Sequence, residues 1–66
     1  MSVEYDKETD TLLIKLKDVD KLDYAEEIGN AIVHFKDGEV VEIEILNASK
    51  VLCKEYLRLI PTIIFP

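Results

Sequence analysis

Cysteine, tryptophan, glycine and proline are scarce in this chain of 66 residues: it has one cysteine, no tryptophan, two glycines and two prolines. A single thiol, Cys53, cannot form an intramolecular disulfide and cannot supply a cysteine-rich zinc site. So few glycines and prolines are atypical of a disordered or low-complexity chain. We therefore expect one small folded domain over residues 1–66.

Basic residues are also in the minority, with 8 Lys and Arg against 14 Asp and Glu and a net charge of −6. Nucleic-acid binding needs clustered cations, so no nucleic-acid partner is expected, and the short basic stripe of Lys50, Lys54 and Arg58 does not change this. A basic protein is the partner that the charge favours. Alternatively, the acidity only keeps an apolar domain soluble.

Long apolar runs are absent as well. No run approaches the roughly 20 residues of a membrane span, so no membrane partner is expected. The first residues, Met1 to Glu4, lack the basic and apolar regions of a signal peptide. Together with the lone thiol, this predicts a cytoplasmic location.

Hydrophobic residues, in contrast, are abundant and make up 48% of the chain. A domain of this size buries only about 60% of its unfolded surface, so it cannot easily hide them all. We expect a homo-oligomer, most simply a twofold dimer. The predicted oligomer interface consists of Val33, Phe35, Ile63, Ile64 and Phe65.

Alternating and β-branched segments predict a sheet over residues 3–46. The expected strands cover residues 3–5, 11–16, 28–35 and 40–46. Residues 17–27 are interpreted as a loop across the sheet, with a short strand around Leu22–Tyr24 as an alternative.

Asp37-Gly38 predicts a two-residue turn with φ above zero at both positions. Counting back from this turn pairs Phe35 with Val40 and His34 with Val41. The predicted face of His34 then carries Ile32, Val41, Ile43 and Ile45, and the opposite face carries Val33, Phe35, Val40, Leu46, Glu42 and Glu44.

A helix is expected over about residues 49–60, because apolar residues recur there at helical spacing. Asn47 or Ser49 would cap it, Pro61 would end it, and an apolar tail would follow over 61–66. The predicted fold is of the α+β class, a four-stranded antiparallel β-sheet with this C-terminal helix packed on one face. That face would carry Leu12, Ile14, Ile43 and Ile45.

Five polar residues are candidates for an interaction or functional role: Asp6, Asp10, His34, Glu42 and Glu44. Paired carboxylates can perform acid–base chemistry, but this needs a cleft that a small domain hardly offers. Turn capping is the simpler interpretation of the two aspartates. A lone histidine is more often structural when no His-x-His or Cys-x-x-Cys spacing supplies further metal ligands. We therefore predict no catalytic residue, cofactor or metal. Of the two possibilities, we favour a protein that is not an enzyme.

Two motifs resemble a known family. They are Tyr5-Asp6-x3-Asp10-x-Leu12 and Asp37-Gly38-x-Val40-Val41-x-Ile43-Glu44-Ile45-Leu46-x-Ala48-Ser49. They are similar to the small prokaryotic domain-of-unknown-function family 2283, over residues 3–49. The family usually has glycine where Glu42 stands, and this departure puts in question the bulge or close backbone approach that glycine would allow. The resemblance implies a β-rich sheet plus helix, and an antitoxin-like role beside small toxin-like proteins.

The predicted function is that of a non-enzymatic protein-interaction module that binds first of all itself. The partner beyond itself would be a basic, toxin-like protein. The alternative is a small ligand-binding or enzymatic domain that uses its acidic residues at an oligomer interface.

Overall fold

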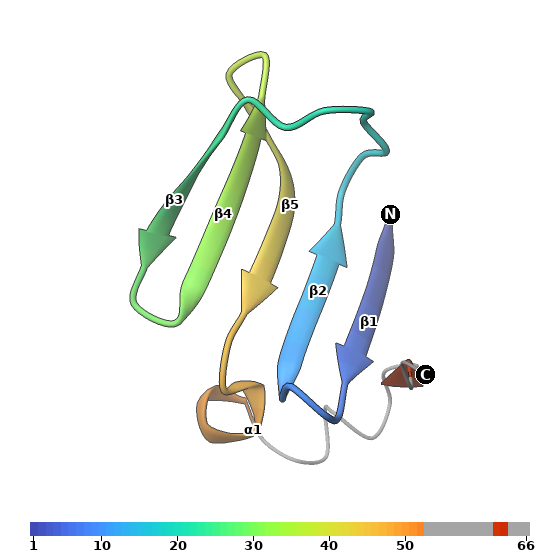
Figure 1. Cartoon of the computed structure of the whole chain (residues 1–66), viewed down its shortest axis with the longest axis vertical. Helices are drawn as coiled ribbons and strands as arrows, with labels where there is room; N and C mark the ends of the chain where they lie inside the picture. Colours follow the sequence, from blue (N-terminus) through green and yellow to red (C-terminus); the bar gives the residue numbers. More distant parts are fainter. Residues whose placement is uncertain (53–61, 64–66) are drawn as a thin grey trace.

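The computed structural model describes residues 1–52 and 62–63. They form a mainly antiparallel sheet with one short helix (Figure 1). The elements are β1 (Ser2–Asp6), β2 (Thr11–Lys15), β3 (Tyr24–Ile28), β4 (Ala31–Lys36), β5 (Glu39–Ile45), α1 (Ala48–Val51) and β6 (Thr62–Ile63). The α+β class is confirmed, but the sheet has five antiparallel strands and not four.

The strand order is β3-β4-β5-β2-β1-β6. The two hairpins β1–β2 and β4–β5 meet where β2 pairs with β5, and β3 extends the sheet on the β4 side. The two-residue strand β6 runs parallel to β1. Among the described strands, β3 therefore lies at one edge of the sheet, beside β4 (Figure 1).

The predicted third strand over 28–35 is wrong, because a tight turn divides it. Ile28 pairs with Ala31, which leaves Gly29 and Asn30 as a two-residue loop, and Gly29 has a φ of 58°. Glycine at the first central position is typical of a type II′ hairpin turn. Residues 24–27 of the predicted loop 17–27 consequently belong to strand β3, which begins at Tyr24, where the short strand suggested around Leu22–Tyr24 would end.

The predicted turn is confirmed, but the predicted register beyond it is wrong. Asp37 and Gly38 have φ values of 51° and 78°, and Phe35 pairs with Val40 as expected. A register shift between His34 and Phe35 then places Glu42, and not Val41, opposite His34. One extra residue in one strand defines a β-bulge, and it moves every later side chain of that strand to the other face.

The bulge sorts the sheet into two chemically distinct faces. One face, here called the histidine face, carries Ile32, His34, Glu42, Glu44, Leu13 and Lys15. The opposite, apolar face carries Val3, Tyr5, Leu12, Ile14, Val33, Ile43 and Ile45. The core cluster of buried residues lies at one end of the apolar face and consists of Tyr5, Leu12 and Ala48, with Val3, Ile14, Ile45 and Leu52 packed against it.

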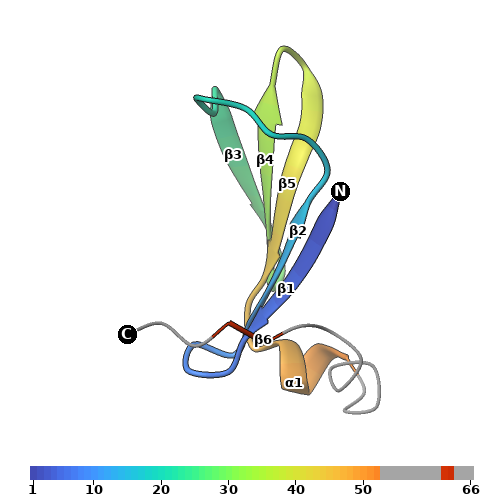
Figure 2. The ribbon, with the colours of Figure 1, turned by 90° about the vertical axis from the view of Figure 1, so that its right-hand side faces the viewer.

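Helix α1 is shorter than the predicted helix over 49–60. It ends at Val51, and Leu52 is already extended, with φ −112° and ψ 153°. Asn47 occupies the N-cap position in a left-handed conformation but makes no side-chain capping bond. Figures 1 and 2 show α1 at the end of the sheet, beside the end of β5 and the start of β2. The rest of the predicted helix, and the tail residues 61 and 64–66, lie outside the described residues.

Candidate functional site

Asp10 joins the first hairpin to the helix. Its carboxylate accepts a hydrogen bond of 2.5 Å from the Tyr5 hydroxyl at Oδ1. The same carboxylate accepts bonds from the Ser49 backbone N–H (3.0 Å) and from Ser49 Oγ (2.7 Å). The Asp10 carbonyl also accepts the Ala48 N–H at 2.9 Å. We call Tyr5, Asp10 and Ser49 the aspartate lock, because it ties together chain segments 39 residues apart.

The lock fixes the charge of Asp10. Hydrogen bonds from Tyr5 and from Ser49 lower the pKa of the Asp10 carboxyl, because they favour its ionised form. The same bond to Asp10 raises the pKa of Tyr5, since the phenol must keep its proton in order to donate. A carboxylate that is already saturated with donors is poorly suited to acid–base work. Asp10 therefore has a structural place in this fold.

Asp6 caps the turn that leads to Asp10. Its carboxylate accepts the Glu8 backbone N–H and the Thr9 hydroxyl, both at 2.9 Å. Such local bonds are typical of an Asx-type turn. Asp6 thus follows the turn-capping interpretation. Asp10 does not, because its carboxylate bonds to Tyr5 and to the distant Ser49 and not to the turn itself.

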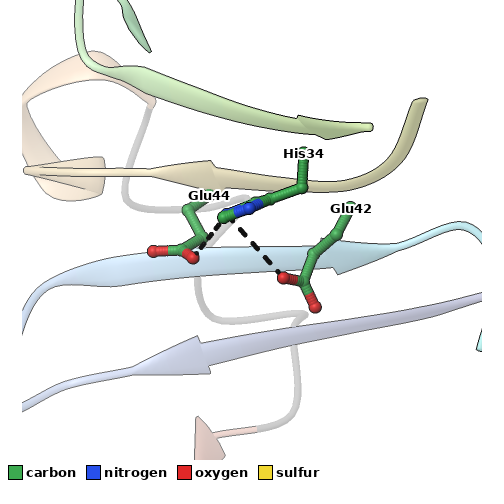
Figure 3. Close-up of side chains that lie close together, drawn as sticks. All are labelled: His34, Glu42 and Glu44. Carbon is green, nitrogen blue, oxygen red and sulfur yellow. Dashed lines mark hydrogen bonds and ion pairs between the residues drawn. The ribbon is translucent and has the colours of Figure 1, made fainter. Parts of the chain in front are cut away.

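His34, Glu42 and Glu44 converge on the histidine face (Figure 3). The His34 Nε2–H donates to Glu44 Oε1 at 2.8 Å, and Glu42 Oε2 lies 3.8 Å from the same nitrogen. His34 stands on β4, and both glutamates stand two residues apart on β5, so alternation places them on one face. We call these residues the His–Glu cluster. Three of the five candidate residues are thus brought together, and Asp6 and Asp10 stay outside the cluster.

The bulge is what assembles this cluster. In the register predicted from the turn, His34 would face Val41, and both glutamates would project from the opposite face. The shift puts Glu42 opposite His34 and Glu44 opposite Ile32. A bulge is therefore present although Glu42 stands at the position of the family's usual glycine.

A shallow hollow adjoins the cluster on the same face. Glu42 and Glu44 line it on one side. Its other lining residues are Asp6, Thr9, Thr11, Leu13 and Lys15. Lys15 of β2 is opposite Glu42 of β5 in the strand register and lines the same hollow, but among the described residues it forms no ion pair with either glutamate. The hollow is open to solvent and is not a deep cleft of the kind that glycoside hydrolysis needs.

The edge strand β3 is the feature that the sequence analysis missed. All five residues from Tyr24 to Ile28 are exposed. The Tyr24 ring stacks on Phe35 with centroids 4.7 Å apart, although Tyr24 remains 51% exposed. The Gly29-Asn30 dipeptide is a hairpin signal that could have revealed this strand.

Two exposed ion pairs lie on either side of the Asp37-Gly38 turn. Lys36 pairs with Asp23 at 3.2 Å, and Lys17 pairs with Glu39. The Asp37 backbone N–H and then Lys36 lower the pKa of Asp23, and Lys17 lowers the pKa of Glu39. Among the residues that the structure describes, neither Glu26 nor Glu27 of β3 forms an ion pair.

The predicted interface residues are distributed over several places. Val33 and Phe35 are half-buried on the apolar face. Ile63 belongs to β6 and pairs with Asp6 of β1. Ile64 and Phe65 lie outside the described residues. Within the ranges 1–52 and 62–63, no helix has the length and apolarity needed to cross a membrane.

Comparison with known proteins agrees with the motifs. Residues 2–49 match the model of the family described as "Protein of unknown function (DUF2283)". No curated protein matches the chain, and no solved structure does. The matched range contains Tyr5, Asp10 and Ser49, so it spans the aspartate lock that holds the fold together. The chain belongs to the DUF2283 family.

Proposed function

We propose that this protein is a non-enzymatic protein-interaction module whose edge strand β3 pairs with a strand from a basic partner protein. The observation that carries the proposal is the exposure of all five residues of an edge strand. An edge strand leaves a row of backbone N–H and C=O groups unpaired, and a partner strand can bond to them.

The side chains of β3 indicate the chemistry of that partner. Tyr24 and Ile28, at its two ends, are 51% and 63% exposed and offer apolar contacts. Glu26 and Glu27 lie between them, and successive strand residues point to opposite faces of the sheet. A partner strand with a cation on each side would match both carboxylates.

The same charges disfavour pairing of β3 with a second copy of itself. An antiparallel, twofold arrangement centred on β3 would place Glu26 directly opposite Glu26. Like charges directly opposite one another destabilise a strand pair. The edge therefore suits a different, basic protein, and a small toxin-like protein is the partner that the family resemblance implies. We also propose a cytoplasmic location for this pair, in keeping with the lone thiol.

Self-association remains a separate proposal, for which the apolar face is the natural surface. Val33 and Phe35 are half-buried there, as are Ile14 and Ile43. Sedimentation at micromolar concentration tests it, and Val33→Lys should shift a dimer towards monomer. A wild-type protein that sediments as a monomer at that concentration would contradict the dimer.

Co-purification from native cells tests the edge-strand proposal. The bait is the full chain in three forms: wild type, Glu26→Lys with Glu27→Lys, and Asp18→Lys with Asp20→Lys. Both double variants change the net charge equally, but Asp18 and Asp20 lie in the loop before β3. We expect a basic partner with the wild type and the loop variant, and its loss with the edge variant.

Two results would contradict this proposal. Equal loss of the partner in both double variants would show that net charge alone drives binding. Unchanged binding of the edge variant would show that the partner docks elsewhere. Circular dichroism of each bait confirms beforehand that the sheet is intact.

A further inference from the structure

We propose that the His–Glu cluster on the histidine face binds a zinc ion, with His34 Nε2, Glu42 and Glu44 as ligands. One nitrogen and two carboxylate oxygens from these residues lie within 4.8 Å of one another. Imidazole nitrogen and carboxylate oxygen are both common zinc ligands. The site borders the β3 edge, since His34 is opposite Ala25, but it shares no residue with β3 and does not depend on the partner proposed above.

The distances fit a tetrahedral ion. With zinc–ligand bonds of about 2.0–2.2 Å, neighbouring ligand atoms are about 3.4 Å apart. His34 Nε2 lies 2.8 Å from Glu44 Oε1 and 3.8 Å from Glu42 Oε2, which brackets that value. To hold the ion, the contact of 2.8 Å between His34 Nε2 and Glu44 Oε1 would have to lengthen to about 3.4 Å. Zinc would then replace the proton that His34 shares with Glu44.

The sheet holds these ligands in place before any ion binds. The side chains of His34, Glu42 and Glu44 are only 15%, 19% and 31% exposed, so they are not mobile surface groups. His34 and Glu42 are direct cross-strand neighbours because of the bulge. Bulges re-aim side chains and recur beside functional sites. Two half-buried carboxylates beside one imidazole form an environment that a divalent cation stabilises.

Glu42 and Glu44 also line the open hollow, so water there would be able to complete the coordination of an ion that they hold. Three protein ligands plus one water are the arrangement of open zinc sites, in contrast to structural sites, which have four protein ligands. Lys15 lines the same hollow and is opposite Glu42 in the strand register. Its positive charge therefore lowers the affinity of the site for a cation. Zinc is favoured over Mg²⁺ or Ca²⁺, because those ions prefer all-oxygen ligands.

Titration of the full chain with zinc chloride tests the site, in a Cys53→Ser background so that no thiol supplies a ligand. His34 is the only histidine, so one pair of imidazole ¹⁵N signals reports on it directly. We expect one zinc ion per chain and a coordination shift at Nε2 of His34. Mg²⁺ at the same concentrations should leave these signals in place.

Calorimetric titration of variants identifies the other ligands. Glu42→Gln and Glu44→Gln should each weaken zinc binding at least tenfold, a loss typical of altered metal ligation. Glu8→Gln removes the same charge from an exposed turn outside both proposed sites and should leave the zinc affinity unchanged. Lys15→Gln should tighten binding, because it removes the opposing cation.

Several outcomes would overturn the zinc site. These are zinc binding without a shift of the His34 signals, equal affinity of Glu44→Gln and wild type, or binding of Mg²⁺ as tight as that of zinc. Thermal unfolding of each metal-free variant shows whether the sheet persists. The imidazole signals of the Cys53→Ser chain, which keeps all three proposed ligands, decide the question even if a glutamate variant fails to fold.

Discussion

At the scale of single residues, an acidic side chain takes its role from its partners and not from its place in a motif. Asp10 belongs to the first family motif, and its carboxylate is occupied by Tyr5 and Ser49. Glu42 departs from the family pattern, yet it contributes to the His–Glu cluster. Asp10 of the first motif thus ties the first hairpin to the helix. The candidate metal site combines Glu44 of the second motif with Glu42, which stands where the family usually has glycine, and with His34.

Replacing Asp10 with Asn should lower the free energy of unfolding. It should also make that free energy depend less on pH in the acidic range. The folded state depresses the pKa of Asp10, so its contribution is complete above the unfolded value of about 3.9 and is lost as the pH falls through the folded pKa. Urea denaturation at several pH values between 7 and 2 measures this. The gap between wild type and Asp10→Asn should be widest near neutrality and should narrow below about pH 4.

Glu39→Gln is the matched control for this prediction. The pKa of Glu39 is also lowered, but its partner Lys17 forms an exposed ion pair with it, and such pairs contribute little. The control should stay close to the wild type throughout. If Asp10→Asn and Glu39→Gln behaved alike, the aspartate lock would have no special part in stability.

At the scale of elements, local sequence signals predict the hairpin and the turn correctly, but they do not predict irregularities in the pairing between strands. The β1–β2 hairpin and the turn at Asp37-Gly38 follow from alternation and turn chemistry, and both are present. The bulge at Val41 leaves no trace in the hydrophobic pattern, because Val40, Val41 and Ile43 suit either register. The predicted register consequently separated His34 from Glu42, and the His–Glu cluster could not be predicted.

Strand β3 was missed for a different reason. Its sequence has two adjacent acids between Tyr24-Ala25 and Ile28, and acids are depleted in strands. An edge position tolerates them, because charge there discourages unwanted pairing. The turn at Gly29-Asn30 was the stronger signal, and the β-branched run after it concealed the break.

Gly38 offers a test of the second hairpin. It has a φ of 78°, and no atom lies within 4 Å of the position that a Cβ would take, so the cost of a side chain there comes from the backbone alone. Gly38→Ala should destabilise by about 1–2 kcal/mol, and Gly38→Asn by less, because Asn tolerates this region better. Chemical denaturation of both variants measures the difference. Equal stability of Ala and Gly at this position would contradict the turn geometry.

At the scale of the whole molecule, the sheet presents three different surfaces. The apolar face contains the core cluster at the helix end, the histidine face carries the His–Glu cluster beside an open hollow, and β3 forms a free acidic edge. These surfaces lie on separate parts of one sheet, so a partner at the edge and an ion on the face would not compete for the same residues. A small domain can therefore combine two binding roles without a deep cleft.

Backbone hydrogen exchange of the full chain tests the central claim, that β3 is the docking edge, most directly. The exchange rates of the backbone amides would be measured for the chain alone and for its complex with the basic partner that co-purifies. The account predicts new protection that is concentrated in the amides of Tyr24 to Ile28, since strand addition bonds the groups that an edge leaves free. Protection that appears on β1 or around α1 while β3 stays unchanged would contradict it.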